Sequence, residues 1–176
     1  AQTLAHHGPL SDRLLGASGS AETYDGQPAL DPRNPDILLA SGSVPDPWGQ
    51  DSRAWIRLSA DGGRSWRDPI LVPLCGFKWL QGRPATAVRP DGTWLLCLTA
   101  NRPDGTLGRA VAFASADGGR NWTFLSYMAP STDGHLVSCP QPLLLADGRI
   151  VAALRCQRTR RAAWTELIVS EDGGRS

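Results

Sequence analysis

"SADGGRSW" at Ser59–Trp66 and "SADGGRNW" at Ser115–Trp122 are almost the same eight residues, and "SEDGGRS" from Ser170 begins the phrase a third time. The three serines are 56 and 55 residues apart. A fixed period of this size is typical of proteins built from repeated supersecondary units. We therefore interpret the 176-residue chain as a series of such units.

A second string recurs upstream of each phrase: "GQPALDPRNPD" from Gly26, "GRPATAVRPDG" from Gly82 and "CPQPLLLADGR" from Cys139. Aligned on Pro28, Pro84 and Pro142, these strings are 56 and 58 residues apart, so the whole unit repeats and not only the phrase. We divide the chain into a leader with a first outer segment, 1–25, and three units at about 26–81, 82–138 and 139–176, the last one incomplete.

The residue pattern of each unit predicts β-structure. Short apolar runs such as "TWLLCLTA" and "RIVAALR" lie between turn residues, and "RAWIRLS" and "RAVAFAS" alternate apolar with polar positions. The Asp-Gly-Gly of the phrase suits a hairpin, because glycine adopts positive φ without strain. Its serine and aspartate can bond the backbone amides of the same turn. About four strands per unit is the size of one propeller blade, so we predict an all-β propeller with about three blades present.

The phrase resembles the Asp box, or BNR repeat, of the sialidases (neuraminidases), whose β-propellers have six blades. The resemblance implies that this chain holds about three of six blades. It also implies that the boxes are structural turns on the outer rim, away from the active site. The box residues are Ser59, Asp61, Gly63, Trp66, Ser115, Asp117, Gly119, Trp122, Ser170, Asp172 and Gly174.

Sialidases hold the substrate carboxylate with three arginines and use a tyrosine nucleophile, paired with a glutamate, and an aspartate as acid/base. Guanidinium groups suit the first task because they bind carboxylates in a bidentate manner. The second unit resembles the first sialidase blade, which implies Arg83 and Arg102 as substrate ligands and Asp104 as the catalytic acid. Arg155 of the third unit is implied as a further substrate ligand. Arg83 directly precedes Pro84, whereas the family has one residue between the two.

The first unit contains a polar loop, "VPDPWGQDSR", before its phrase. Trp48 and Asp51 of this loop could contact a sugar, because aromatic faces pack on sugar rings. A solvated loop is the alternative for this segment, as an ordinary "RPDG" turn is for Asp104.

We expect the amino-terminal part of a sialidase-like exo-glycosidase that acts on terminal sialic acid or a related anionic sugar. No glutamate occurs between Glu22 and Glu166, and neither Tyr24 nor Tyr127 follows a nucleophile motif. The nucleophile and the third arginine are therefore expected outside this chain. Two alternatives stay open: a non-catalytic propeller that binds glycans or proteins, and a sialidase-fold lyase that acts on uronic-acid polysaccharides.

Composition excludes some partners. The net charge of +1 and the absence of a basic run interleaved with aromatic residues argue against nucleic acid. No apolar stretch is long enough to span a membrane, and no apolar signal core occurs near the start. We expect a secreted or periplasmic protein, with the cytoplasm as the alternative. Self-association is expected if three blades are the whole protein.

We predict no cofactor and no metal site. The four cysteines, Cys75, Cys97, Cys139 and Cys156, lack CxxC spacing, so either one or two disulfides or buried thiols fit them. The histidines His6, His7 and His135 lack neighbouring ligands in the sequence and are expected on the surface or in loops. The aspartates are dispersed among turns, which leaves calcium binding open.

Overall fold

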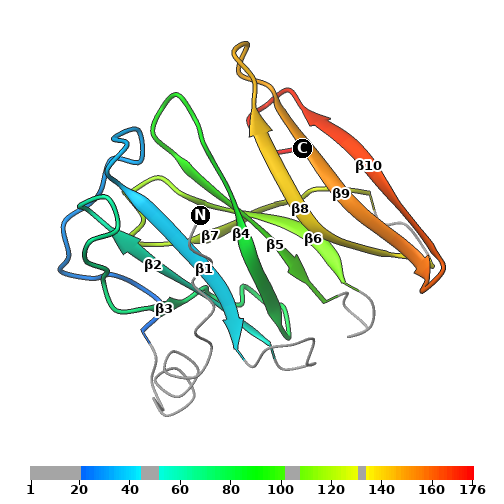
Figure 1. Ribbon diagram of the computed structural model, residues 1–176, viewed down its shortest axis with the longest axis horizontal. Helices are drawn as coiled ribbons and strands as arrows, with labels where there is room; N and C mark the ends of the chain where they lie inside the picture. Colours follow the sequence, from blue (N-terminus) through cyan, green and yellow to red (C-terminus); the bar gives the residue numbers. More distant parts are fainter. Residues whose placement is uncertain (1–20, 45–51, 102–107, 131–133) are drawn as a thin grey trace.

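The computed structural model describes residues 21–44, 52–101, 108–130 and 134–176, with the backbone alone for residues 82–84. Within these ranges the chain forms ten strands in three antiparallel sheets, which lie side by side in chain order (Figure 1). The prediction of an all-β fold is confirmed. The same ranges contain no helix of the length and apolar character needed to cross a membrane.

The first sheet consists of β1 (Leu38–Val44), β2 (Arg53–Ser59) and β3 (Ile70–Leu71) in that order. The alternation in β2 places Ala54, Ile56 and Leu58 on a fully buried face. This face packs against apolar side chains of the second sheet, and the two sheets share one hydrophobic core. The period-2 pattern of the sequence thus decides which face of β2 becomes core.

Residues 26–33 form no strand, so the first unit contributes three strands and not the four expected per unit. Prolines at 28 and 32 remove two backbone N–H donors from this segment. The segment instead lies against the second repeated phrase, where Leu30 N donates to Gly118 O (3.1 Å) and Tyr24 N donates to Arg120 O (3.0 Å).

The second sheet contains four strands in chain order: β4 (Leu80–Val88), β5 (Trp94–Ala100), β6 (Arg109–Ser115) and β7 (Thr123–Tyr127). All seven residues of β5 are buried. The continuous apolar run "WLLCLTA" fits this environment, because β5 has strands on both sides and packed sheets against both faces.

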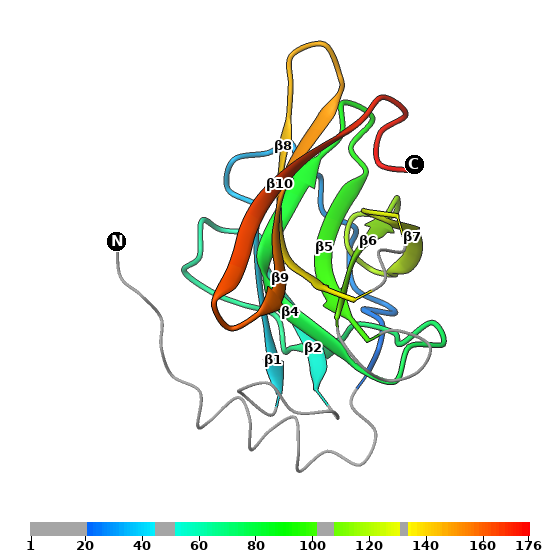
Figure 2. The same ribbon diagram turned by 90° about the vertical axis from the view of Figure 1, so that its right-hand side faces the viewer.

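The third sheet has the order β10-β9-β8, formed by β8 (Leu136–Leu144), β9 (Ile150–Thr159) and β10 (Ala162–Ser170). In β9 the residues Ile150, Ala152, Leu154 and Cys156 are buried and alternate with more exposed positions. Leu143, Leu167 and Val169 are 63%, 72% and 52% exposed. Figure 2 looks onto this sheet, with β9 and β10 towards the viewer and the second sheet behind them.

Strand β4 packs against β1 of the first sheet and β8 of the third sheet (Figure 1). The three repeated phrases follow the ends of β2, β6 and β10. They lie at the same ends of the strands, and we call this side of the molecule the turn edge. At the opposite edge β1 and β5 end and β2 and β6 begin. Backbone bonds from Leu80 N to Ser52 O (2.9 Å) and from Val137 N to Gly108 O (3.1 Å) join neighbouring sheets at that opposite edge.

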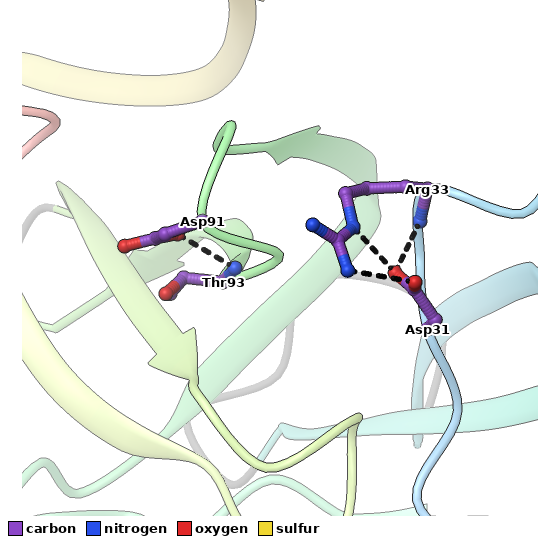
Figure 3. Close-up of polar contacts among 4 residues, drawn as sticks. All are labelled: Asp31, Arg33, Asp91 and Thr93. Atoms are coloured by element: carbon purple, nitrogen blue, oxygen red, sulfur yellow. Dashed lines mark hydrogen bonds and ion pairs between the residues drawn. The ribbon is translucent and has the colours of Figure 1, made fainter.

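Two further turns meet at the turn edge, as Figure 3 shows. Arg33 binds the Asp31 carboxylate through Nε and Nη2 (2.8 Å each), and this hydrogen bonding holds the pKa of Asp31 at about 2. Thr93 N donates to Asp91 Oδ1 (2.9 Å) and closes the turn between β4 and β5. Gly92 of that turn lies against Arg33, with Nε 3.6 Å from where a Cβ would stand. The turn that precedes β1 therefore contacts the turn of the second sheet.

Candidate functional site

The repeated phrase folds as a self-contained turn. Ser59 Oγ accepts from Gly63 N (2.8 Å) and donates to Asp61 Oδ1 (2.8 Å). The same Asp61 carboxylate accepts from Ser65 N (2.9 Å) and Ser65 Oγ (2.5 Å). These bonds to the charged form lower the pKa of Asp61 to about 2. Asp61 is therefore fully engaged in holding the turn together.

The second and third phrases use the same bonds. Gly119 N donates to Ser115 Oγ (2.9 Å), and Gly174 N donates to Ser170 Oγ (2.7 Å). Asp117 and Asp172 each accept a hydrogen bond from the hydroxyl of their own serine (2.8 Å). Each also accepts one from the backbone N–H four residues further on (3.0 Å). Each of the three aspartates thus holds its own turn together by hydrogen bonds.

The sequence named six candidate residues for chemistry outside the repeated phrases. Most of them lie outside the described residues: Trp48, Asp51, Arg102 and Asp104. Asn101, which directly precedes this last group, is 3% exposed, and its Oδ1 accepts from Lys78 N (2.7 Å) and Trp79 N (3.0 Å). The buried Asn101 side chain therefore holds the backbone of Lys78 and Trp79 against the end of β5.

Arg83 lies in β4, where the pairing with β5 becomes irregular between Gly82 and Thr86. Three residues of β4 oppose one residue of β5 there, which is the pattern of a β-bulge. Bulges change the direction in which a strand presents its side chains. The exact spacing between Arg83 and Pro84 therefore does not by itself decide which way the arginine faces.

Strand β8 has an irregularity at the corresponding place, between Ser138 and Gln141. Counted back from the turns that end both strands, Cys139 corresponds to Arg83 and Pro140 to Pro84, 56 residues apart in each case. The alignment of Pro84 with Pro142 in the sequence is therefore wrong by two residues. Cys139 has a φ of 51° and its N donates to Thr99 Oγ1 (3.1 Å), so this bulge is tied to β5.

Arg155 lies on β9, opposite Ser138 of β8 and Thr165 of β10. Because side chains alternate along a strand, Arg155 points away from the face on which Leu154 and Cys156 pack. It is exposed, and its Nη2 donates to Gln157 Oε1 (2.8 Å). Among the described residues the structure brings Arg155 next to no other predicted site residue.

Both tyrosines make structural contacts. Tyr24 is 5% exposed, its hydroxyl donates to Asp68 O (2.8 Å), and burial raises its pKa to about 12. The Arg109 guanidinium stacks 3.6 Å from the centre of the Tyr127 ring. Both side chains are therefore held by contacts within the fold.

All four cysteines are free, so the disulfide alternative is not realised. Burial raises the pKa of the Cys97 thiol to about 12. Burial and the neighbouring Glu166 carboxylate raise the pKa of the Cys156 thiol to about 11. His135 lies in the bend before β8, as one of the two expected settings, but it is buried, with only 7% exposed. It lies beside Cys156 and Glu166, and the ligand atoms of all three lie within 4.8 Å of one another.

A cavity of about 550 Å³ lies between the outer strands of the second and third sheets. Its walls are mainly apolar, with Leu95, Ile150 and Ile168 among them, and Gly174 and Ser176 of the third phrase border it. Arg109 is its one charged lining residue in the described part of the chain. Without a carboxylate this cavity lacks the acid that sugar hydrolysis requires, so the opposite edge remains the better candidate.

No protein-family model matches the chain, and no curated protein matches it in sequence. Among solved structures, its fold resembles a protein of unknown function from Dyadobacter fermentans (TM-score 0.65, 19% identity, 79% of this chain and 45% of that one). It also resembles the Hadza microbial sialidase Hz136 (TM-score 0.62, 16% identity, 84% and 31%). A third similar structure is the Penicillium chrysogenum α-L-arabinanase complexed with arabinobiose (TM-score 0.57, 24% identity, 77% and 43%).

These likenesses confirm the predicted sialidase-like propeller fold, of which the three sheets form an arc of about three blades. At such identities they show the fold alone. The chain spans less than half the length of each of the three proteins. The total of six blades stays a prediction.

Proposed function

We propose that this chain is part of a glycoside hydrolase of the sialidase-like propeller type that cleaves a terminal anionic sugar, with sialic acid as the first candidate. The observation that carries the proposal is the likeness of its fold to a sialidase and to an arabinanase. The confinement of the repeated turns to one edge supports it further, because the opposite edge is then left for substrate.

In this proposal Arg83, Arg102 and Arg155 contact the substrate carboxylate, and Asp104 protonates the leaving group. Trp48 and Asp51 contact the sugar ring and its hydroxyls. The bulge that contains Arg83 favours its role, since bulges are frequent beside active sites. The nucleophile would come from other blades of the complete protein, because Tyr24 and Tyr127 are both held in structural contacts.

The first test compares substrates. The complete protein is given an aryl sialoside and an aryl arabinofuranoside, and released phenol is measured. Turnover of the sialoside alone supports the proposal for an anionic sugar. Turnover of the arabinofuranoside alone would support a glycosidase but contradict the anionic substrate. Turnover of neither compound would contradict both the glycosidase activity and the anionic substrate.

The second test concerns the acid. Asp104→Asn should lower turnover about 10²- to 10⁴-fold for a sialoside with an alkyl or sugar leaving group, which needs protonation. An aryl sialoside, whose leaving group is a better one, should be affected much less. Asp91→Asn is the matched control, since Asp91 closes a turn at the turn edge and should leave turnover unchanged. Equal turnover by Asp104→Asn and the unaltered protein would exclude Asp104 from this role.

A glycan-binding propeller without catalysis is the second candidate function. The absence of any glutamate between Glu22 and Glu166 favours it, because the tyrosine of a sialidase needs a glutamate partner. Binding of a sialoside to the complete protein without release of product would select this candidate. A lyase would instead yield an unsaturated uronic acid from a polyuronide, which is detected by its ultraviolet absorbance.

A further inference from the structure

Three residues with metal-binding side chains meet on one face of the third sheet. Cys156 of β9 is paired with Val137 of β8 and with Trp164 of β10. His135 lies two residues before Val137, and Glu166 lies two residues after Trp164. Because side chains two apart share a face, His135, Cys156 and Glu166 follow one diagonal across the sheet.

This face is turned towards the second sheet and is largely apolar. Cys156 is fully buried in a cluster with Ala110, Ala129, Val137 and Leu154. His135 is 7% exposed and Glu166 is half-buried. A thiol, an imidazole and a carboxylate side by side are costly to remove from water unless their polar atoms are satisfied together. A cation bound between them could be held by all three ligand atoms.

The combination of ligand atoms selects the class of cation. Sulfur and imidazole nitrogen favour zinc and similar transition metals, whereas magnesium and calcium prefer oxygen ligands alone. Zinc takes cysteine, histidine and carboxylate ligands, and in sites with three protein ligands water is the fourth. The set His135, Cys156 and Glu166 fits this pattern.

The distances require only a small adjustment. The three ligand atoms lie within 4.8 Å of one another. In a tetrahedral zinc site with bonds of about 2.0–2.3 Å, ligand atoms are about 3.3–3.8 Å apart. Glu166 lies on the edge strand β10, where its flexible side chain can move inwards by the remaining ångström.

A neighbouring indole already orients the carboxylate. Trp164 Nε1 donates to Glu166 Oε1 (2.7 Å), and the Trp164 ring lies 5.1 Å from the His135 ring. Outer partners of this kind, which hold a ligand in position by a hydrogen bond, are a regular feature of metal sites. One tryptophan therefore contacts two of the three candidate ligands.

We propose that His135, Cys156 and Glu166 form a zinc site that ties the start of β8 to β9 and β10. Zinc binding converts the Cys156 thiol to a thiolate, and the proton passes to solvent. The imidazole binds as the neutral form and water completes the tetrahedron. This site is independent of the proposed glycosidase activity.

The direct test is metal binding by the full chain after treatment with a chelator. Zinc is added to the chelator-treated chain and unbound metal is removed by dialysis. We then expect one zinc ion per chain, measured by elemental mass spectrometry. Cobalt(II) in place of zinc should give the intense visible bands of a tetrahedral site and a near-ultraviolet thiolate-to-metal band. Less than about 0.1 zinc per chain, or a cobalt spectrum without the thiolate band, would overturn the proposal.

Variants identify the ligands. Glu166→Gln, His135→Gln and Cys156→Ser should each weaken zinc binding about 100-fold or more. Glu171→Gln and Cys75→Ser are matched controls at exposed positions and should bind zinc as the unaltered chain does. Glu166→Gln decides the matter if Cys156→Ser does not fold, because Glu166 lies on the half-exposed edge strand. Zinc binding that survives Glu166→Gln and His135→Gln unchanged would refute this ligand set.

Discussion

The second and third repeated phrases have the same hydrogen bonds but different surroundings. At the second phrase a Cβ on Gly119 would lie 2.5 Å from Trp94 and 2.7 Å from Leu58, and Trp122 stacks on Trp94 with ring centres 6.1 Å apart. At the third phrase the nearest atoms to a Cβ on Gly174 are 3.6 Å away, and the 550 Å³ cavity begins there. The turn is therefore a local structure, whereas the packing around it is supplied by the neighbouring sheets.

The largest expected effect comes from the tryptophans of the first and second phrases, whose surroundings also differ. Trp122 is 2% exposed and Trp66 only half-buried, although both donate from Nε1 to the turn glycine at 3.1 Å. Trp122→Ala should lower the free energy of unfolding by about 3–5 kcal/mol, and Trp66→Ala by about half of that. Urea denaturation of the two variants measures the difference. Equal losses would mean that the shared hydrogen bond, and not burial, gives the tryptophan its importance.

The glycines give a smaller and sharper contrast. Gly119 and Gly174 have φ of 83° and 87°, so alanine is strained by about 1–2 kcal/mol at either position. Gly119→Ala must in addition displace Trp94 and Leu58, which should add about 1–3 kcal/mol. Gly174→Ala has room for its methyl group. Thermal unfolding should therefore place Gly119→Ala well below Gly174→Ala, and the reverse order would contradict the packing described here.

The smallest effect concerns pH at the exposed first phrase. Bonds from the Ser65 hydroxyl, the Ser65 amide and the Ser59 hydroxyl lower the pKa of Asp61 from 3.8 to about 2. A lowered pKa means that Asp61 stabilises the fold above about pH 4 and that this contribution is lost as the pH falls towards 2. Asp61→Asn should show a flatter decline of stability over that range.

Chemical denaturation at a series of pH values measures this decline. Asp25→Asn is the matched control, because Asp25 is an exposed aspartate outside the repeated phrases. A decline in Asp61→Asn as steep as in the unaltered chain would remove Asp61 as its source.

Much of the fold could be predicted from particular residues. The runs "TWLLCLTA" and "RAVAFAS" appear as β5 and β6, and the period-2 pattern of "RAWIRLS" gives the buried face of β2. The expectation of about four strands per unit was wrong for the first unit, because residues 26–33 form no strand and Leu30 bonds to the second phrase instead. A residue pattern reports the intrinsic preference of a segment, whereas its partner is decided by the rest of the fold.

The candidate site was less accessible to prediction. The resemblance to sialidases named Arg83, Arg102, Asp104 and Arg155, and of these only Arg155 has a described side chain. The cluster of His135, Cys156 and Glu166 was missed because its members are separated by 21 and 10 residues and share no motif. They meet only through the register of β8, β9 and β10, which pairs Cys156 with both Val137 and Trp164.

The sequence by itself determined the repeated turns and the strands between them. Every bond from Ser59 and Asp61 within the first phrase spans at most four residues, so the local sequence suffices to form it. Only the tertiary structure decided that Trp122 is buried against Trp94, that β8 bulges at Cys139, and that three metal-binding side chains share one face. These contacts join residues tens of positions apart, and they depend on how whole sheets pack and pair.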